Sequence, residues 1–302
     1  MCGLGESRSM FKRVANEVWV FDAEWVPDPI AGRLLYNLPA HMPDWDVVQE
    51  MWGRNGATAE NPRPYLKTIL CRVVSIAIVI RRVLQDTSVR LYLVSLPTDP
   101  EHNHAWDEAG LLSQFLTRLG QRQPQIVGFN SQAADLKIFL QRGLVHGLRV
   151  PNFCRRPAKP WEGVDYFART EDWHIDLLDV LSGRGNTMPS LHQLALLSGI
   201  PGKLDLEGEQ VADLWRDGDR QRILHYNECD ALTTYLLWLR MAHFAGFFTT
   251  EAYEEEQTCV RALIAEKAQN PRHAHLRAYQ ATWDRLQGRP PVLRSMEDSH
   301  PC

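Results

Sequence analysis

Acidic side chains at three well-separated points of the chain could together bind metal ions. Asp22 and Glu24 lie in the first hydrophobic run, and Asp135 follows the apolar run Ile126–Phe129. A fourth acid, Asp230, lies in a late segment with a helical pattern. Carboxylate oxygens are the ligands that Mg²⁺ and Mn²⁺ prefer, and no cluster of His or Cys points to zinc. Four such acids suit a site that holds two divalent cations and cleaves phosphodiesters.

Each acidic position also has a structural explanation. Asp22 and Glu24 leave the same face of a predicted strand, and such a face is often solvent-exposed. Asp135 falls in the first turn of a predicted helix, where an acid favours the positive helix end. Tyr226 and Asp230 share one helix face and could be a hydrogen-bonded core pair. The metal site is favoured because all three explanations would otherwise have to hold at once.

Hydrophobic patterns predict the elements that position these acids. Strands are expected at 18–22, 73–81, 89–94, 126–129 and 174–178, and helices at 111–119, 133–144, 190–199, 207–216 and 219–246. The second and third strands are joined too closely to pair other than antiparallel. Residues 27–68 form a long excursion with one possible helix near 45–52, and a lid over a substrate groove is one hypothesis for it. The order of elements supports an α/β fold with a mixed sheet.

Composition narrows the class of protein. The net charge of −4 counts against a protein that coats DNA or RNA non-specifically, because such binding needs many phosphate contacts. It does not count against an enzyme that holds only a few nucleotides. The six cysteines are scattered without metal-ligand spacing, which is typical of reduced thiols in a cytosolic protein. No secretory signal is visible at the N-terminus, and the most apolar run, Val73–Ile80, is too short to cross a membrane. A soluble cytoplasmic protein is expected.

The three acidic motifs resemble those of the DEDD superfamily of 3′–5′ exonucleases, in the branch with Tyr in the third motif. The greatest similarity is to bacterial predicted exonucleases related to the proofreading domain of family-B DNA polymerases. The runs that carry it are 20–24, 127–135 and 226–231, with accessory runs at 174–182 and 199–208. One departure is Ala134, which stands where the family usually has Phe. The similarity covers Val14 to Phe248.

The resemblance implies a ribonuclease-H-like fold, with a mixed sheet flanked by helices. Together with the sequence pattern it predicts an exonuclease domain at residues 14–248. A flexible N-terminus is expected at 1–13. The remaining residues, 249–302, are expected to form a helical C-terminal extension with a disordered end.

Residue roles follow from the same resemblance. Asp22 would bridge two Mg²⁺ or Mn²⁺ ions, Glu24 and Asp230 would complete the site that holds the attacking water, and Asp135 would support the second ion. Tyr226 would orient the water. Residues weighed as substrate contacts, against alternatives as core, turn or solvated loop residues, are Trp25, Asn130, Lys203, Arg155 and Arg156.

The expected activity is metal-dependent 3′–5′ exonuclease action on single-stranded 3′ ends, with DNA favoured over RNA. One alternative is a catalytically silent module that binds nucleic acid and has kept the fold. Another is a scaffold protein that acts through the charged helix after Thr249. The presence of all four acids and Tyr226 favours the enzyme.

Overall fold

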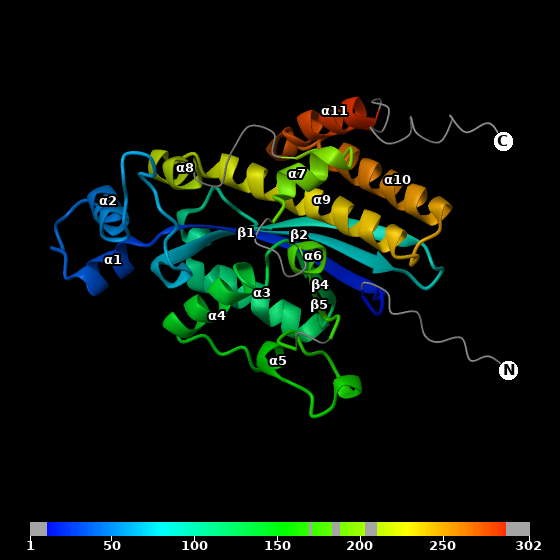
Figure 1. The fold of residues 1–302 in the computed structure, drawn as a ribbon, viewed down its shortest axis with the longest axis horizontal. Helices are drawn as coiled ribbons and strands as arrows, with labels where there is room; N and C mark the ends of the chain where they lie inside the picture. Colours follow the sequence, from blue (N-terminus) through cyan, green and yellow to red (C-terminus); the bar gives the residue numbers. More distant parts are fainter. Residues whose placement is uncertain (1–10, 169–170, 183–187, 203–209, 288–302) are drawn as a thin grey trace.

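The computed structural model describes residues 11–168, 171–182, 188–202 and 210–287 (Figure 1). Its strands are β1 (Glu17–Pro27), β2 (Cys71–Val83), β3 (Val89–Leu96), β4 (Gln125–Gly128) and β5 (His174–Asp176). The longer helices are α1 (Pro29–Tyr36), α2 (Asp44–Arg54), α3 (Glu108–Arg122), α4 (Asp135–Val145), α9 (Arg220–Phe244), α10 (Thr250–Lys267) and α11 (Leu276–Gln287). The shorter ones are α5 (Pro151–Cys154), α6 (Leu177–Ser182), α7 (Leu191–Leu197) and α8 (Val211–Asp217).

The strands form one mixed sheet in the order β3-β2-β1-β4-β5. β2 pairs antiparallel with β3, as their close connection predicts, and also with β1, while β4 runs parallel to β1 and to β5. The middle of β2 is buried on both faces, which explains its nearly continuous apolar sequence. This mixed sheet, flanked by helices, confirms the expected α/β class. The last strand is shorter than expected, because α6 begins directly after Asp176.

Alternate side chains of β1 enter two hydrophobic clusters on opposite faces of the sheet. Val18 and Val20 pack with residues of α9, α10 and α11, whereas Trp19 and Phe21 pack with residues of α3 and α4. Figure 1 shows α9 and α10 on one side of the sheet and α3 and α4 on the other. Because strand side chains alternate, Asp22 continues the row that faces α9.

Residues 28–70 leave the end of β1 as an arm that carries α1 and α2 (Figure 1). The sequence predicted only the second of these helices, although the first has a clear start signal. Asp28 accepts a hydrogen bond from the first turn of α1, and Pro29 occupies its first position. Gly32 lets α1 lie close to α2, because an added Cβ would fall 2.6 Å from the sulfur of Met51.

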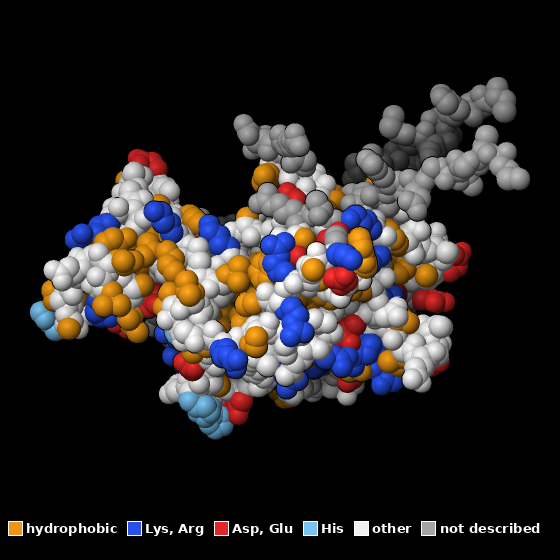
Figure 2. All heavy atoms as spheres, turned by 90° about the horizontal axis from the view of Figure 1, so that it is seen from below, with side chains coloured by type: hydrophobic (Ala, Val, Ile, Leu, Met, Phe, Trp, Pro, Cys, Tyr) orange, Lys and Arg blue, Asp and Glu red, His pale blue; other side chains and the backbone are white. Residues whose placement is uncertain are grey.

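The outer face of α1 is apolar and exposed. Figure 2 shows hydrophobic side chains gathered over this end of the molecule, with Lys and Arg side chains among them. The exposed apolar side chains of α1 are Ile30, Leu34 and Leu35.

The two C-terminal helices belong to the same core as the sheet. Tyr279 and Trp283 of α11 are fully buried in the cluster that also contains β1 and α9. Arg81 of β2 forms a buried ion pair with Glu256 of α10. Glu256 also accepts a hydrogen bond from the hydroxyl of Tyr235 on α9, at 2.9 Å. The extension is therefore tied to the sheet by both apolar and polar contacts.

Parts of the expected termini, residues 1–10 and 288–302, lie outside the described residues. Phe11 is buried, and its ring stacks on that of Phe247 with 4.6 Å between centroids. None of the helices in the described part of the chain is both long enough and apolar enough to cross a membrane.

Candidate active site

The candidate site lies in the part of β1 that extends beyond its pairing with β4. The two strands pair only from Val18 to Val20, so Asp22 and Glu24 have no strand partner on that side among the described residues. On the other side both remain paired with β2. The open edge of β1 is therefore accessible to side chains from other elements, and α4 and α9 supply them.

Asp22 and Glu24 meet a third carboxylate from α9. Asp22, Glu24 and Asp230 each offer an oxygen, and these three oxygens lie within 4.8 Å of one another. The two β1 acids are half-buried, whereas Asp230 is only 5% exposed. The sequence patterns predicted that these acids share one metal site, and in the structure the three carboxylates are neighbours.

Asp135 reaches the same place from the first turn of α4. Its Oδ1 accepts a hydrogen bond from the backbone N–H of Ala23 at 3.1 Å, and Ala23 is the residue between the two acids of β1. The side chain is buried. The carboxylate therefore contacts β1, while the residue also lies in the first turn of α4, as the helix-end explanation expected.

The turn before α4 is held by Asp176 at the end of β5. One oxygen of Asp176 accepts the backbone N–H of Asn130 at 2.8 Å, and the other accepts that of Gln132 at 2.9 Å. The same side chain accepts the N–H of Leu178 at the start of α6. Asn130 has the left-handed φ of 61°, which Asn tolerates better than most residues. Asp176 thus caps α6 and also orients the turn that leads to Asp135.

A second contact fixes this turn against the sheet. Ser131 Oγ lies 2.8 Å from Nε2 of His174, and both side chains are buried. A Cβ on Gly128 would fall 2.4 Å from Cβ of Ser131, so only glycine allows so close an approach. Burial lowers the pKa of His174 to about 4, which keeps its ring neutral.

The four acids repel one another in the absence of a cation. Burial raises the pKa of Asp22 well above its ordinary value, and the charges of Glu24, Asp135 and Asp230 raise it further. Burial also raises the pKa of Asp135, to about 8, against the opposing effect of its backbone hydrogen bonds. Carboxylates held together in this way are stabilised by protons or by metal ions.

The residues present fit a hard divalent cation. In the described part of the chain, Asp22, Glu24 and Asp230 are the group of potential ligands close enough to hold a metal ion, and all are carboxylates. Oxygen donors alone favour Mg²⁺ or Mn²⁺ over zinc. Burial is the largest cause of the raised pKa values of Asp22 and Asp135, and for Asp22 the charges of the neighbouring acids add to it.

Two neighbours on α9 orient the acids. Tyr226 makes a side-chain hydrogen bond with Asp230, and burial together with the nearby carboxylates raises the pKa of Tyr226. Asn227 donates from Nδ2 to Oδ2 of Asp22 at 2.7 Å, and its own Oδ1 accepts from the hydroxyl of Ser75 at 2.9 Å. The sequence analysis missed Asn227 and Ser75. A polar residue within an apolar helix, and another within an apolar strand, were the available signals.

The expected substrate contacts are more scattered. Trp25 is half-buried and packs against the hydrophobic cluster that contains residues of α3 and α4. Asn130 lies in the turn before α4, where its backbone N–H donates to Asp176. Arg156 pairs with Asp165 at 2.9 Å, and Arg155 is exposed on the same loop after α5. Lys203 lies outside the described residues.

Comparison with known proteins identifies the family. Residues 63–283 match the family described as predicted 3′-5′ exonucleases related to the exonuclease domain of PolB. The match includes Asp135, Tyr226 and Asp230 but begins after Asp22 and Glu24, whose place beside Asp230 comes from the structure. No curated protein matches the chain. Since the match covers well over half of its residues, the chain belongs to this family of predicted 3′-5′ exonucleases.

Proposed function

We propose that the protein is a metal-dependent 3′–5′ exonuclease that hydrolyses phosphodiester bonds at single-stranded 3′ ends. The observation that carries the proposal is the set of three carboxylate oxygens within 4.8 Å, contributed by β1 and α9 at the open edge of the sheet. Family membership supports the direction of cleavage.

The acids are proposed to hold two Mg²⁺ or Mn²⁺ ions, with Asp22, Glu24 and Asp230 as direct ligands and Asp135 as support. When bound, these ions would supply an activated water and stabilise the charge on the attacking and leaving oxygens. Asn227 keeps the Asp22 carboxylate turned toward the site, since it donates to one oxygen and leaves the other available.

Tyr226 is proposed to orient the attacking water. Its hydroxyl is held at Asp230, and burial and the nearby acids raise its pKa, so the group keeps its proton. It therefore acts by donating or accepting a hydrogen bond, not as a general base. The proton released by the water must pass to another acceptor, for which the carboxylates or solvent are available.

DNA is proposed as the preferred substrate because the family is described as related to the exonuclease domain of PolB. The cytoplasm is the proposed compartment. Cys71, Cys154, Cys229 and Cys259 are free thiols, which supports a reducing environment.

The scaffold alternative placed the function in the C-terminal helices. Glu256 and Trp283 instead face the core, where they contact β2, α9 and α10. The division of the chain at residue 248 stays a proposal. We infer that truncation there would expose the apolar cluster of the catalytic domain, so loss of activity by truncation would not by itself reveal a scaffold.

The proposal is tested with single strands of identical sequence, labelled at either end and incubated with Mg²⁺, Mn²⁺ or EDTA. DNA labelled at the 5′ end should give a ladder that shortens with time, while label at the 3′ end should be released at once as a mononucleotide. RNA should be cut more slowly. Equal rates on both sugars would refute the DNA preference. Binding without cleavage in either metal would refute the enzyme and support the silent module.

A further inference from the structure

A cleft lies on the α3 side of the sheet, away from the acids of the active site. It has a volume of about 390 Å³ and is lined by side chains of β1, β2, β3 and α3. Trp19 of β1 is one of them, and it belongs to the hydrophobic cluster on the α3 face. Asp22 instead meets Asn227 of α9. The cleft and the active site therefore lie on opposite faces of the sheet.

The floor of the cleft is an apolar surface that runs across three strands. The strand register pairs Trp19 of β1 with Ile80 of β2, and Ile78 of β2 with Val94 of β3. Paired residues point to the same face of a sheet, so these four side chains form one continuous surface. Phe115 of α3 covers part of it, with 6.5 Å between its ring centroid and that of Trp19. Ile80 and Val94 remain partly exposed, so the surface extends beyond the helix.

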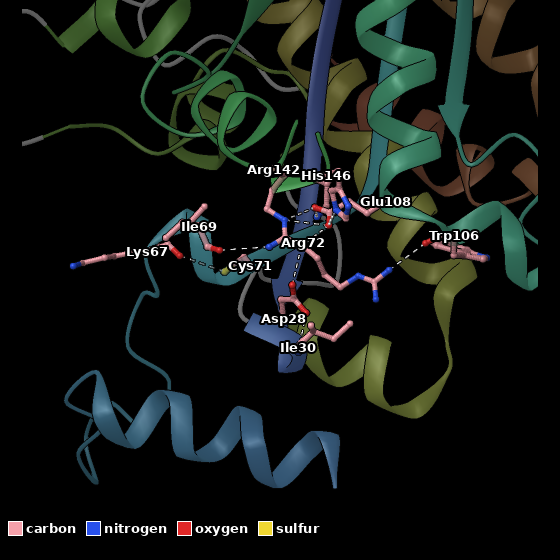
Figure 3. Close-up of polar contacts among 11 residues, drawn as sticks. Asp28, Ile30, Lys67, Ile69, Cys71, Arg72, Trp106, Glu108, Arg142 and His146 are labelled. Atoms are coloured by element: carbon pink, nitrogen blue, oxygen red, sulfur yellow. Dashed lines mark hydrogen bonds and ion pairs between the residues drawn. The ribbon is translucent and has the colours of Figure 1, made fainter. Parts of the chain in front are cut away.

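The helix that forms the wall is fixed to the sheet at both ends. At the start of α3, Glu108 accepts the backbone N–H of Val73 in β2 at 2.7 Å and pairs with Arg142 of α4 at 2.6 Å (Figure 3). At its end, Arg122 pairs with Glu17 of β1. The cleft is therefore formed before any ligand binds, which lowers the cost of binding.

The charged groups that line the cleft are all positive. They are Arg82 of β2 and Arg118 and Arg122 of α3, and none of its described lining residues is an acid. The neighbouring acid is Glu17, which pairs with Arg82 at 3.1 Å and with Arg122. Three arginines and one carboxylate leave two positive charges in excess. Arg118 is exposed and forms no ion pair within the described part of the chain.

The arginines lie along one wall, and the floor beside them is apolar. Gln114, Arg118 and Arg122 are spaced four residues apart, so they follow one face of α3. Their polar ends therefore border the strands as a row. A guanidinium binds a carboxylate or a phosphate through two parallel hydrogen bonds, whereas the strands offer only apolar contacts. The cleft thus presents two kinds of surface to a single ligand.

We propose that this cleft binds a small organic anion, with its apolar body on the strands and its carboxylate or phosphate group at Arg118 and Arg122. The volume lies in the range of small-molecule sites, which are mostly apolar with a few polar groups that fix orientation. Three strands span about 10 Å, enough for a body of one or two fused rings. The inference does not depend on the proposed function, because the ligand occupies the opposite face of the sheet.

The test measures binding of anilinonaphthalenesulfonate, a two-ring anion whose fluorescence rises in an apolar site. The full chain is titrated in EDTA, so that no metal ion in the active site attracts the probe. Arg118→Glu should weaken binding by about 10-fold or more, because it replaces the unpaired cation with an anion. Val94→Trp should also weaken binding, because it fills the floor without changing the charge. Both variants should keep the circular dichroism of the wild type.

The matched control is Arg285→Glu. Arg285 is an exposed helical arginine of α11, a helix packed on the other face of the sheet. The control makes the same change in net charge, so it should keep the affinity of the wild type. Equal weakening by Arg118→Glu and Arg285→Glu would overturn the inference, and so would wild-type affinity in Arg118→Glu.

Competition with the probe identifies the acidic group of the ligand. Naphthoate offers a carboxylate, deoxyadenosine monophosphate offers a phosphate, and naphthalenemethanol has the apolar body without the charge. At least one of the two anions should displace the probe, and the neutral alcohol should be weaker than that anion by about 10-fold or more. The better competitor shows whether the site favours carboxylates or phosphates. Displacement by neither anion would overturn the inference, and so would an alcohol as effective as the anions.

Discussion

Replacing His174 should remove a large part of the acid sensitivity of the fold. His174 is buried against Ser131, and burial lowers its pKa from 6.5 to about 4. Between these two values the unfolded chain binds a proton that the folded protein excludes. The contribution of the neutral ring is therefore fully present above pH 6.5, falls as the pH is lowered, and is gone by about pH 4.

The magnitude follows from the two pKa values. The full loss below about pH 4 corresponds to about 3.4 kcal/mol, and about 2 kcal/mol of it is reached at about pH 5. Between about pH 7.5 and pH 5, the unfolding free energy of the wild type should thus fall by about 2 kcal/mol more than that of His174→Gln. The acids of the site titrate in both proteins, so their effect cancels in this comparison.

The assay is urea unfolding followed by tryptophan fluorescence at the two pH values. His41→Gln makes the same chemical change at an exposed side chain and should keep the pH dependence of the wild type. If His174→Gln loses as much stability as the wild type between the two pH values, burial of a neutral His174 does not account for the acid sensitivity.

Three further changes test other parts of the account. Glu256→Ala leaves the buried Arg81 without its partner and should lower the unfolding free energy by about 3–5 kcal/mol, seen in urea titration; a loss below about 1 kcal/mol would contradict the ion-pair role. Asn227→Ala should cost about 1–3 kcal/mol in stability and lower kcat, because Asp22 loses its donor; unchanged kcat would refute the positioning role. Gly128→Ala should displace Ser131 and lower kcat without preventing folding, as single-turnover rates and circular dichroism would show.

The main elements of the fold could be predicted because their patterns are strong. The apolar run of β2 and the helical spacing in α3 and α9 both specify a single element type, and the structure has each within a few residues of its expected bounds. The order of elements then placed Asp22 and Asp230 near one another. Such adjacency can be predicted without knowing the loop structures, because consecutive elements usually pack against one another.

Other features depend on contacts that spacing does not encode. The helix α1 is only eight residues long and leaves most of its apolar side chains exposed, so its pattern resembled a loop with Pro and Gly. Asn227 binds Asp22 from 205 positions away, and nothing local to either residue indicates the pair. Asp176 likewise has four backbone partners, two of them more than forty residues distant.

The measurement that tests the central claim most directly is the rate at which purified protein shortens a 5′-labelled single-stranded DNA in Mg²⁺, for the wild type and Asp22→Asn. Asp86→Asn changes an exposed acid in the β2–β3 turn and is the control. The account predicts stepwise shortening by the wild type and the control, abolished by EDTA and reduced at least about 100-fold in Asp22→Asn. Shortening of equal rate by Asp22→Asn would contradict the assignment of the active site to the acids of β1 and α9.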